Sequence, residues 1–149
     1  MTRKEFAERM DQIDPGSAEA VDQLAKLFEE DYISSGRDLS DPAVTQSLLD
    51  SARADLGHCM KQYDRLLTKI NGELRKAGAT EAQINWGLFG DVELPTLAYL
   101  RCNRMAKKLI LYSYQISYCL GELKMLGRYA DVDEAELRRI RREYGKRFG

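Results

Sequence analysis

The sequence contains one histidine and three cysteines among its 149 residues, and both shortages exclude kinds of site. Zinc centres use several histidine or cysteine ligands, and the di-iron centres of helical bundles use two histidines. An odd number of cysteines without close spacing does not form a disulfide framework and suits a reducing compartment. We therefore expect buried thiols, no metal site and no cofactor.

Residues that favour strands are also scarce. Valine, isoleucine and threonine together number only 16, whereas leucine, alanine, glutamate, lysine and arginine dominate, a mixture that favours helices. The uncharged stretch over residues 109–121 has 13 residues, fewer than the roughly 20 needed to cross a bilayer. The first ten residues carry charges where a signal peptide is apolar. We expect an all-α, cytoplasmic protein with no membrane partner.

The three prolines mark places where helices begin. Pro15 lies in a turn that ends at Ser17, Pro42 follows Asp41, and Pro95 precedes another periodic segment. Serine and aspartate at these positions accept hydrogen bonds from the first amides of a helix, and proline fits the first turn. The pattern predicts helices over residues 2–13, 17–35, 42–77, 95–127 and from about 133 towards the end of the chain.

Two of these helices are long. Over 42–77 the apolar and small residues recur at steps of three and four, and over 95–127 the steps alternate four and three, which is typical of the seam of a left-handed coiled coil. The seam residues of the later helix are Ala98, Cys102, Met105, Leu109, Tyr112, Ile116, Cys119, Leu123 and Leu126. The spacing predicts one domain, 1–149, built as an up-and-down helical bundle on a long antiparallel helical hairpin.

Outside this seam, the helix over 95–127 carries further apolar residues, among them Leu97, Leu100 and Leu111. A helix that is apolar on several sides usually has several neighbours. We therefore expect this helix to lie centrally in the bundle.

The one histidine follows an arginine at a spacing seen in some nucleases. Arg-x4-His, here Arg53 and His58, resembles the signature of the HEPN ribonucleases, an all-helical family of similar length. The resemblance covers six residues and departs from the family pattern at Ala54, where a polar residue usually stands. It implies a dimeric ribonuclease in which Arg53 and His58 act in catalysis across the dimer.

Helix geometry favours a different interpretation of this pair. Five residues turn a straight helix by about 500°, so the two side chains point roughly 140° apart and do not grip one phosphate together. His58 then lies beside Asp55 and Gln62 as an ordinary helix residue. The sequence contains no nucleophile with a base, no glycine-rich phosphate cradle and no ligand cluster. The favoured interpretation is a protein without enzymatic activity, with the ribonuclease as the alternative.

Charge is unevenly distributed along the chain. Residues 1–56 carry 6 basic and 13 acidic side chains, whereas residues 57–130 carry 11 and 6; these regions either neutralise each other or face different partners. Cations gather on one face of the C-terminal segment, at Arg138, Arg139, Arg142 and Lys146. They make nucleic-acid binding a candidate function. However, no aromatic residues interleave with them for base stacking, and positive charge is favoured late in any helix.

Aromatic residues supply the main candidates for contact with a partner. Tyr114 and Tyr118 lie on the helix over 95–127, and Trp86, Leu88 and Phe89 lie between glycines in the segment before it. Aromatic side chains are enriched where two protein surfaces dehydrate each other. The sequence therefore favours a helical bundle that acts through protein contacts, with itself or with another protein, and that forms a homodimer.

Overall fold

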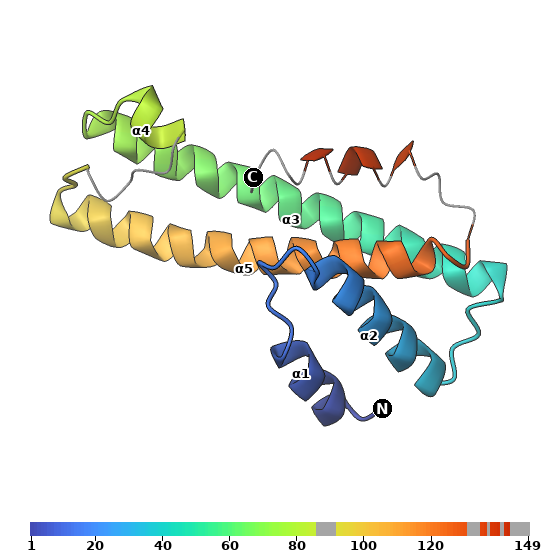
Figure 1. Ribbon diagram of the computed structural model, residues 1–149. Coiled ribbons are helices and arrows are strands. Elements are labelled where there is room, and N and C mark those ends of the chain that lie inside the picture. Colours follow the sequence, from blue (N-terminus) through green and yellow to red (C-terminus); the bar gives the residue numbers. More distant parts are fainter. Residues whose placement is uncertain (86–91, 131–134, 137, 141, 144–149) are drawn as a thin grey trace. The chain divides into compact units, whose positions relative to one another are not determined.

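The computed structural model describes residues 1–85, 92–130, 135–136, 138–140 and 142–143 (Figure 1). Its helices are α1 (Arg3–Asp11), α2 (Ala20–Ser34), α3 (Pro42–Lys76), α4 (Glu81–Asn85) and α5 (Thr96–Leu126). Every regular element formed by these residues is a helix. The prediction of an all-α helical bundle is therefore confirmed.

The chain divides into two compact units. Unit 1 comprises residues 1–57 and 114–149, and unit 2 comprises residues 58–113. The first part of α3 shares unit 1 with the last part of α5, and the remaining parts of both helices share unit 2. Such pairing of opposite ends is expected of an antiparallel helical hairpin. Whether 1–149 behaves as one domain stays a prediction, and each unit is described by itself.

The two long helices begin and end within one residue of their predicted bounds. Asp41 caps α3, because its carboxylate accepts a hydrogen bond of 3.0 Å from the Ala43 amide. After α3 the chain turns at Gly78, whose φ of 91° lies in the left-handed region. The Ala79 amide then donates to the Leu74 carbonyl at 3.0 Å, which is the usual glycine stop of a helix.

The start of α2 differs from the prediction. α1 begins after Thr2, whose hydroxyl caps it as expected, but α2 begins at Ala20 and not at Ser17. The carboxylate and carbonyl oxygens of Asp14 accept hydrogen bonds from the amides of Gly16 (3.0 Å) and Ser17 (3.1 Å). These bonds hold the segment in a turn, so the helix starts three residues later than predicted.

In unit 1, α2 lies across the last part of α5 (Figure 1). Gly121 of α5 makes this approach possible, since a Cβ atom there would lie 2.6 Å from the Leu24 Cβ and 3.3 Å from the Ala25 amide nitrogen. Ion pairs also join the two elements, Lys124 with Asp22 and, just after α5, Arg128 with Glu29. Among the described residues, the largest fully buried side chains all belong to this unit: Leu24, Leu27, Thr45, Leu49, Ile116, Ser117, Leu123, Met125 and Leu126.

In unit 2, a smaller core joins α3, α4 and α5. Its buried members are Ile70, Leu74 and Ile84, and the partly buried side chains packed against them are Ala79, Val92, Leu94, Met105, Ala106 and Leu109. None of the described helices of unit 2 covers the side of α5 that carries Leu97, Leu100 and Leu111. The prediction that this helix lies centrally is therefore wrong in unit 2, because Leu97, Leu100 and Leu111 are exposed.

Candidate functional site

Three leucines of α5 are the most unusual surface feature of unit 2. Leu97 is 71% exposed, Leu100 54% and Leu111 60%. Scattered single apolar residues on a protein surface need no explanation, whereas apolar residues gathered on one face mark contact sites. The question is therefore whether these leucines share a face.

Helix geometry places the three leucines together. At 100° per residue, Leu97, Leu100 and Leu111 fall within an arc of about 60°. The seam residues that pack against the core of unit 2, such as Met105 and Leu109, lie about 80–180° away from the leucines around the helix. The leucines thus form a second apolar stripe, and a coiled-coil seam alone does not require it.

Cations lie within the same stripe. Arg104, Lys107 and Lys108 are exposed and share an arc of about 100° with the leucines. We call the set Leu97, Leu100, Arg104, Lys107, Lys108 and Leu111 the α5 outer face. Residues 96–113 contain four basic and no acidic side chains, so the charge of this face is positive throughout.

The one ion pair of this segment with another described residue lies outside the α5 outer face. Arg101 pairs with Glu73 of α3 at 3.4 Å. No described carboxylate lies within ion-pairing distance of Arg104, Lys107 or Lys108. The α5 outer face therefore carries cations that the described part of unit 2 leaves unneutralised.

Beside the α5 outer face, unit 2 contains an apolar hollow of about 260 Å³. Its lining residues are Ile70, Leu74, Val92, Leu94, Tyr99, Cys102, Asn103 and Ala106. Burial raises the pKa of the Cys102 thiol, with Glu73 as a smaller cause, and a raised pKa disfavours the reactive thiolate. The described lining residues include no carboxylate and no histidine, and the hollow offers space for an apolar group.

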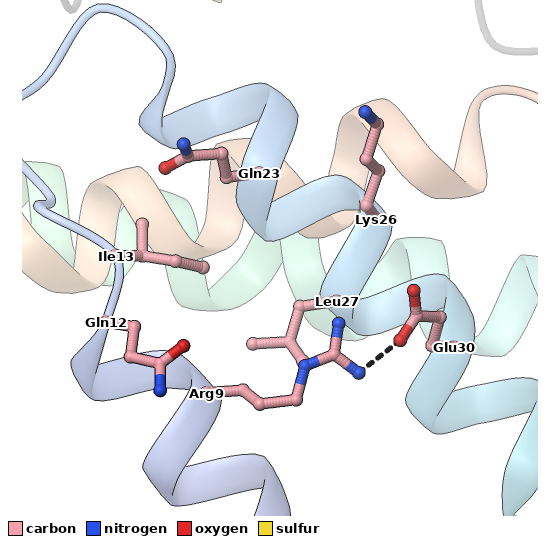
Figure 2. A pocket seen from close by; sticks show the side chains of 7 residues that line it. All are labelled: Arg9, Gln12, Ile13, Gln23, Lys26, Leu27 and Glu30. Carbon is pink, nitrogen blue, oxygen red and sulfur yellow. Dashed lines mark hydrogen bonds and ion pairs between the residues drawn. The ribbon is translucent and has the colours of Figure 1, made fainter.

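A second hollow, of about 290 Å³, lies between α1 and α2 in unit 1 (Figure 2). Figure 2 shows Ile13 and Leu27 lining it, with Arg9 directed towards Glu30. These two charged groups pair, and the Arg9 guanidinium holds the pKa of the Glu30 carboxyl below its usual value. The charges of this hollow therefore serve the contact between α1 and α2.

One titratable pair in unit 1 is largely buried. The Tyr32 hydroxyl of α2 donates a hydrogen bond to the Glu122 carboxylate of α5. Burial raises the pKa of both groups, and the Arg37 guanidinium lies 4.8 Å from the centre of the Tyr32 ring. The clearest role of this pair is to join α2 to α5.

The residues of the ribonuclease alternative have different surroundings. In unit 1, Arg53 is half-buried and pairs with Glu136 at 3.1 Å and with Asp50 at 3.9 Å. In unit 2, His58 is exposed. The sequence could not reveal the pairing of Arg53 with Glu136, because 83 residues separate them. This pairing occupies the arginine that the alternative requires for catalysis.

The other predicted site residues are only partly described. Arg138, Arg139 and Arg142 are exposed, whereas Lys146 lies outside the described residues. Trp86, Leu88 and Phe89 also lie outside them. Tyr114 is 38% exposed and Tyr118 is half-buried. The sequence predicts that Leu97, Leu100 and Leu111 pack inside the bundle, whereas the structure exposes all three.

Comparisons with known proteins add no further constraint. The sequence matches no protein-family model, and comparisons with curated proteins and with solved structures also find no match. The described residues contain no group of three or more histidine, cysteine, aspartate or glutamate side chains placed to hold a metal ion. None of the helices that they form is both long and apolar enough to cross a membrane.

Proposed function

We propose that this chain is a non-enzymatic helical bundle that acts through protein contacts, and that the α5 outer face is its contact surface. The observation that supports the proposal is the exposure of Leu97, Leu100 and Leu111 on one side of a helix whose other side is already packed. Burying an exposed leucine side chain is worth about 1.5–3 kcal/mol. A partner that covers all three therefore gains enough to offset part of the entropy lost on association.

The exposure of Tyr114 supports self-association as a second mode of contact. Tyr114 of unit 1 is 38% exposed, and tyrosine is enriched in the dehydrated centres of interfaces. If copies of the chain pair through this residue, light scattering should report twice the 17.0 kDa of one chain, and Tyr114→Ser should restore the single-chain mass. A single-chain mass for the unsubstituted protein at high concentration excludes this mode.

A crosslinking experiment tests the α5 outer face as a contact surface. A photoreactive amino acid replaces Leu100 in one variant and exposed Arg65 of α3 in a control variant, and each is expressed in the cells that normally produce the chain. We expect a protein adduct from position 100 and none from position 65. Adding Leu97→Gln and Leu111→Gln should remove the adduct. If position 100 yields no protein adduct, the α5 outer face is not a contact surface.

The ribonuclease alternative is tested through its histidine. In that alternative, His58→Ala abolishes RNA cleavage and any growth inhibition on expression. We expect the His58→Ala variant and the unsubstituted chain to behave alike in both the RNA-cleavage and the growth assay, because Arg53 is held by Glu136. Cleavage of RNA by the purified chain that is lost in both His58→Ala and Arg53→Ala would replace the contact proposal with the enzyme.

A further inference from the structure

We propose that the partner of the α5 outer face is an acidic amphipathic helix of another protein, with apolar residues and carboxylates on the same side. This inference rests on the proposed function and adds the chemistry and secondary structure of the partner. It follows from three properties of the α5 outer face: its unneutralised charge, the order of its residues along the helix, and its poor fit to a second copy of itself.

The unneutralised charge selects an acidic partner. Arg104, Lys107 and Lys108 lie between the leucines, and the described carboxylates of the chain leave all three unpaired. A neutral apolar partner that covered the leucines would remove water from these cations without replacing it. Carboxylates on the partner would replace that water with charge-assisted hydrogen bonds. Charge complementarity of this kind also speeds association.

The order of residues selects a helix. Leu97 and Leu100 lie at one end of the α5 outer face and Leu111 at the other, with the cations between them. The face extends over about 21 Å at 1.5 Å per residue, which equals roughly four turns of a partner helix. A helix packed along this length can place apolar residues against both leucine ends and acidic residues against the middle, as paired helices do in coiled coils.

A second copy of the chain fits the same surface poorly. If two copies of α5 packed antiparallel with Leu100 of each opposite Leu111 of the other, Arg104 of each would face Lys107 of the other. A two-fold axis always brings the same patch onto itself, so the cations of both copies gather near the axis. Like charges brought together in this way oppose association.

A lipid surface also fits poorly. Helices that lie in a membrane interface segregate their cations on a polar face and their apolar residues on the other. On the α5 outer face the cations share the arc of the leucines, so burying Leu100 and Leu111 in lipid would draw Lys107 towards the acyl chains. An acidic helix meets both kinds of residue on one side, which a lipid surface cannot do.

The experiment uses the full chain and two synthetic helical peptides. Both peptides have leucines at coiled-coil spacing over four turns; one carries glutamate beside the leucines and the other carries lysine at the same positions. Calorimetry should detect binding of the glutamate peptide only. The double variant Lys107→Glu, Lys108→Glu should weaken this binding by about tenfold or more, or ~1.4 kcal/mol. The control Lys61→Glu, Lys69→Glu reverses the same charge at exposed positions of α3 and should leave binding unchanged.

A second variant and two further probes make the outcome decisive. Arg104→Glu should weaken glutamate-peptide binding as well, and circular dichroism checks that each variant keeps its helices. The inference is wrong if the lysine peptide binds equally well, if only the control variant weakens binding, or if phosphatidylserine vesicles bind while the glutamate peptide does not. It is also wrong if calorimetric dilution shows that the chain forms dimers and that these dimers become stronger both in the Lys107→Glu, Lys108→Glu variant and in the Arg104→Glu variant. A protein adduct at position 100 with no peptide binding rejects only the acidic helix, whereas loss of both rejects the contact surface itself.

Discussion

The two units use the same helix in different ways. In unit 1, Ile116, Leu123 and Leu126 of α5 are essentially inaccessible to solvent. In unit 2, the same helix exposes large apolar side chains, namely Leu97, Tyr99, Leu100, Ile110 and Leu111. One continuous helix therefore serves as a core element at one end and as a surface element at the other. Apolar content alone does not determine which role a segment takes.

The difference arises from the elements that cover α5. In unit 1, α2 is a helix of 15 residues that packs on α5 through Leu24 and Ala25. In unit 2, the described residues outside α3 and α5 form only α4, a helix of five residues, and its Ile84 packs on the seam side. Nothing among them covers the outer side of α5. Unit 2 thus has the smaller core and the more apolar surface.

The largest effect should come from truncating leucines at seam positions. Leu123→Ala removes a side chain that is 1% exposed in unit 1, which typically costs about 2–5 kcal/mol of unfolding free energy. Leu109→Ala makes the same chemical change at a partly buried position of unit 2. We expect about half that loss of unfolding free energy or less, because folding buries less apolar area of the Leu109 side chain than of the Leu123 side chain. Urea titrations of both variants measure the difference; equal losses would contradict the contrast between the units.

The next effect concerns a glycine. Gly121→Ala places a Cβ 2.6 Å from the Leu24 Cβ, so α2 must shift, and overpacking of this kind costs about 1–3 kcal/mol. Gly57→Ala is the matched control, since its Cβ would meet nothing within 4 Å, and alanine should stabilise the helix there by about 0.5–1 kcal/mol. Thermal unfolding should thus shift in opposite directions. A stabilised Gly121→Ala variant would show that α2 does not approach α5 so closely.

Much of the fold could be predicted from the sequence because its signals are local. Steps of three and four along 42–77 and 95–127 reflect the helical period, and Asp41 and Gly78 mark the boundaries by chemistry that acts within a few residues. The bounds of α3 and α5 were therefore accurate to one residue. The start of α2 was not, because Asp14 forms a turn that competes with a cap at Ser17.

The candidate site could be predicted only in part, since its character depends on tertiary contacts. A pattern shows that Leu97 and Leu111 are apolar, but it does not show whether another element covers them. The role of Gly121 was likewise invisible, because it depends on the approach of α2, about 100 residues earlier in the chain. The pairing of Arg53 with Glu136 was missed for the same reason. Sequence periodicity assigns faces, whereas packing decides what each face does.

A smaller effect should appear in the pH dependence of unit 1. Burial raises the pKa of Glu122, and Asp55 raises it further, while Tyr32 and Arg37 act in the opposite direction. Because this pKa is higher in the folded state, the stabilisation from the bound proton is complete below the unfolded pKa and is lost as pH rises through the folded pKa. Glu122→Gln keeps an acceptor for the Tyr32 hydroxyl without the charge. It should be more stable than the parent chain at neutral pH and equal to it in acid, as measured by urea titration across pH; lower stability at neutral pH would contradict this.

The smallest effect should come from the α5 outer face itself. Leu97→Gln and Leu111→Gln replace side chains that are 71% and 60% exposed, and exposed substitutions usually change the unfolding free energy by less than about 0.5 kcal/mol. When the photoreactive amino acid is also placed at position 100, the same two substitutions should remove the protein adduct. Calorimetric unfolding and crosslinking on one preparation measure both properties. A large loss of stability would mean that these leucines are covered by another part of the chain, and unit 2 would then resemble unit 1. Unchanged stability with loss of the adduct would separate the two roles of α5, because the leucines would matter to the partner and not to the fold.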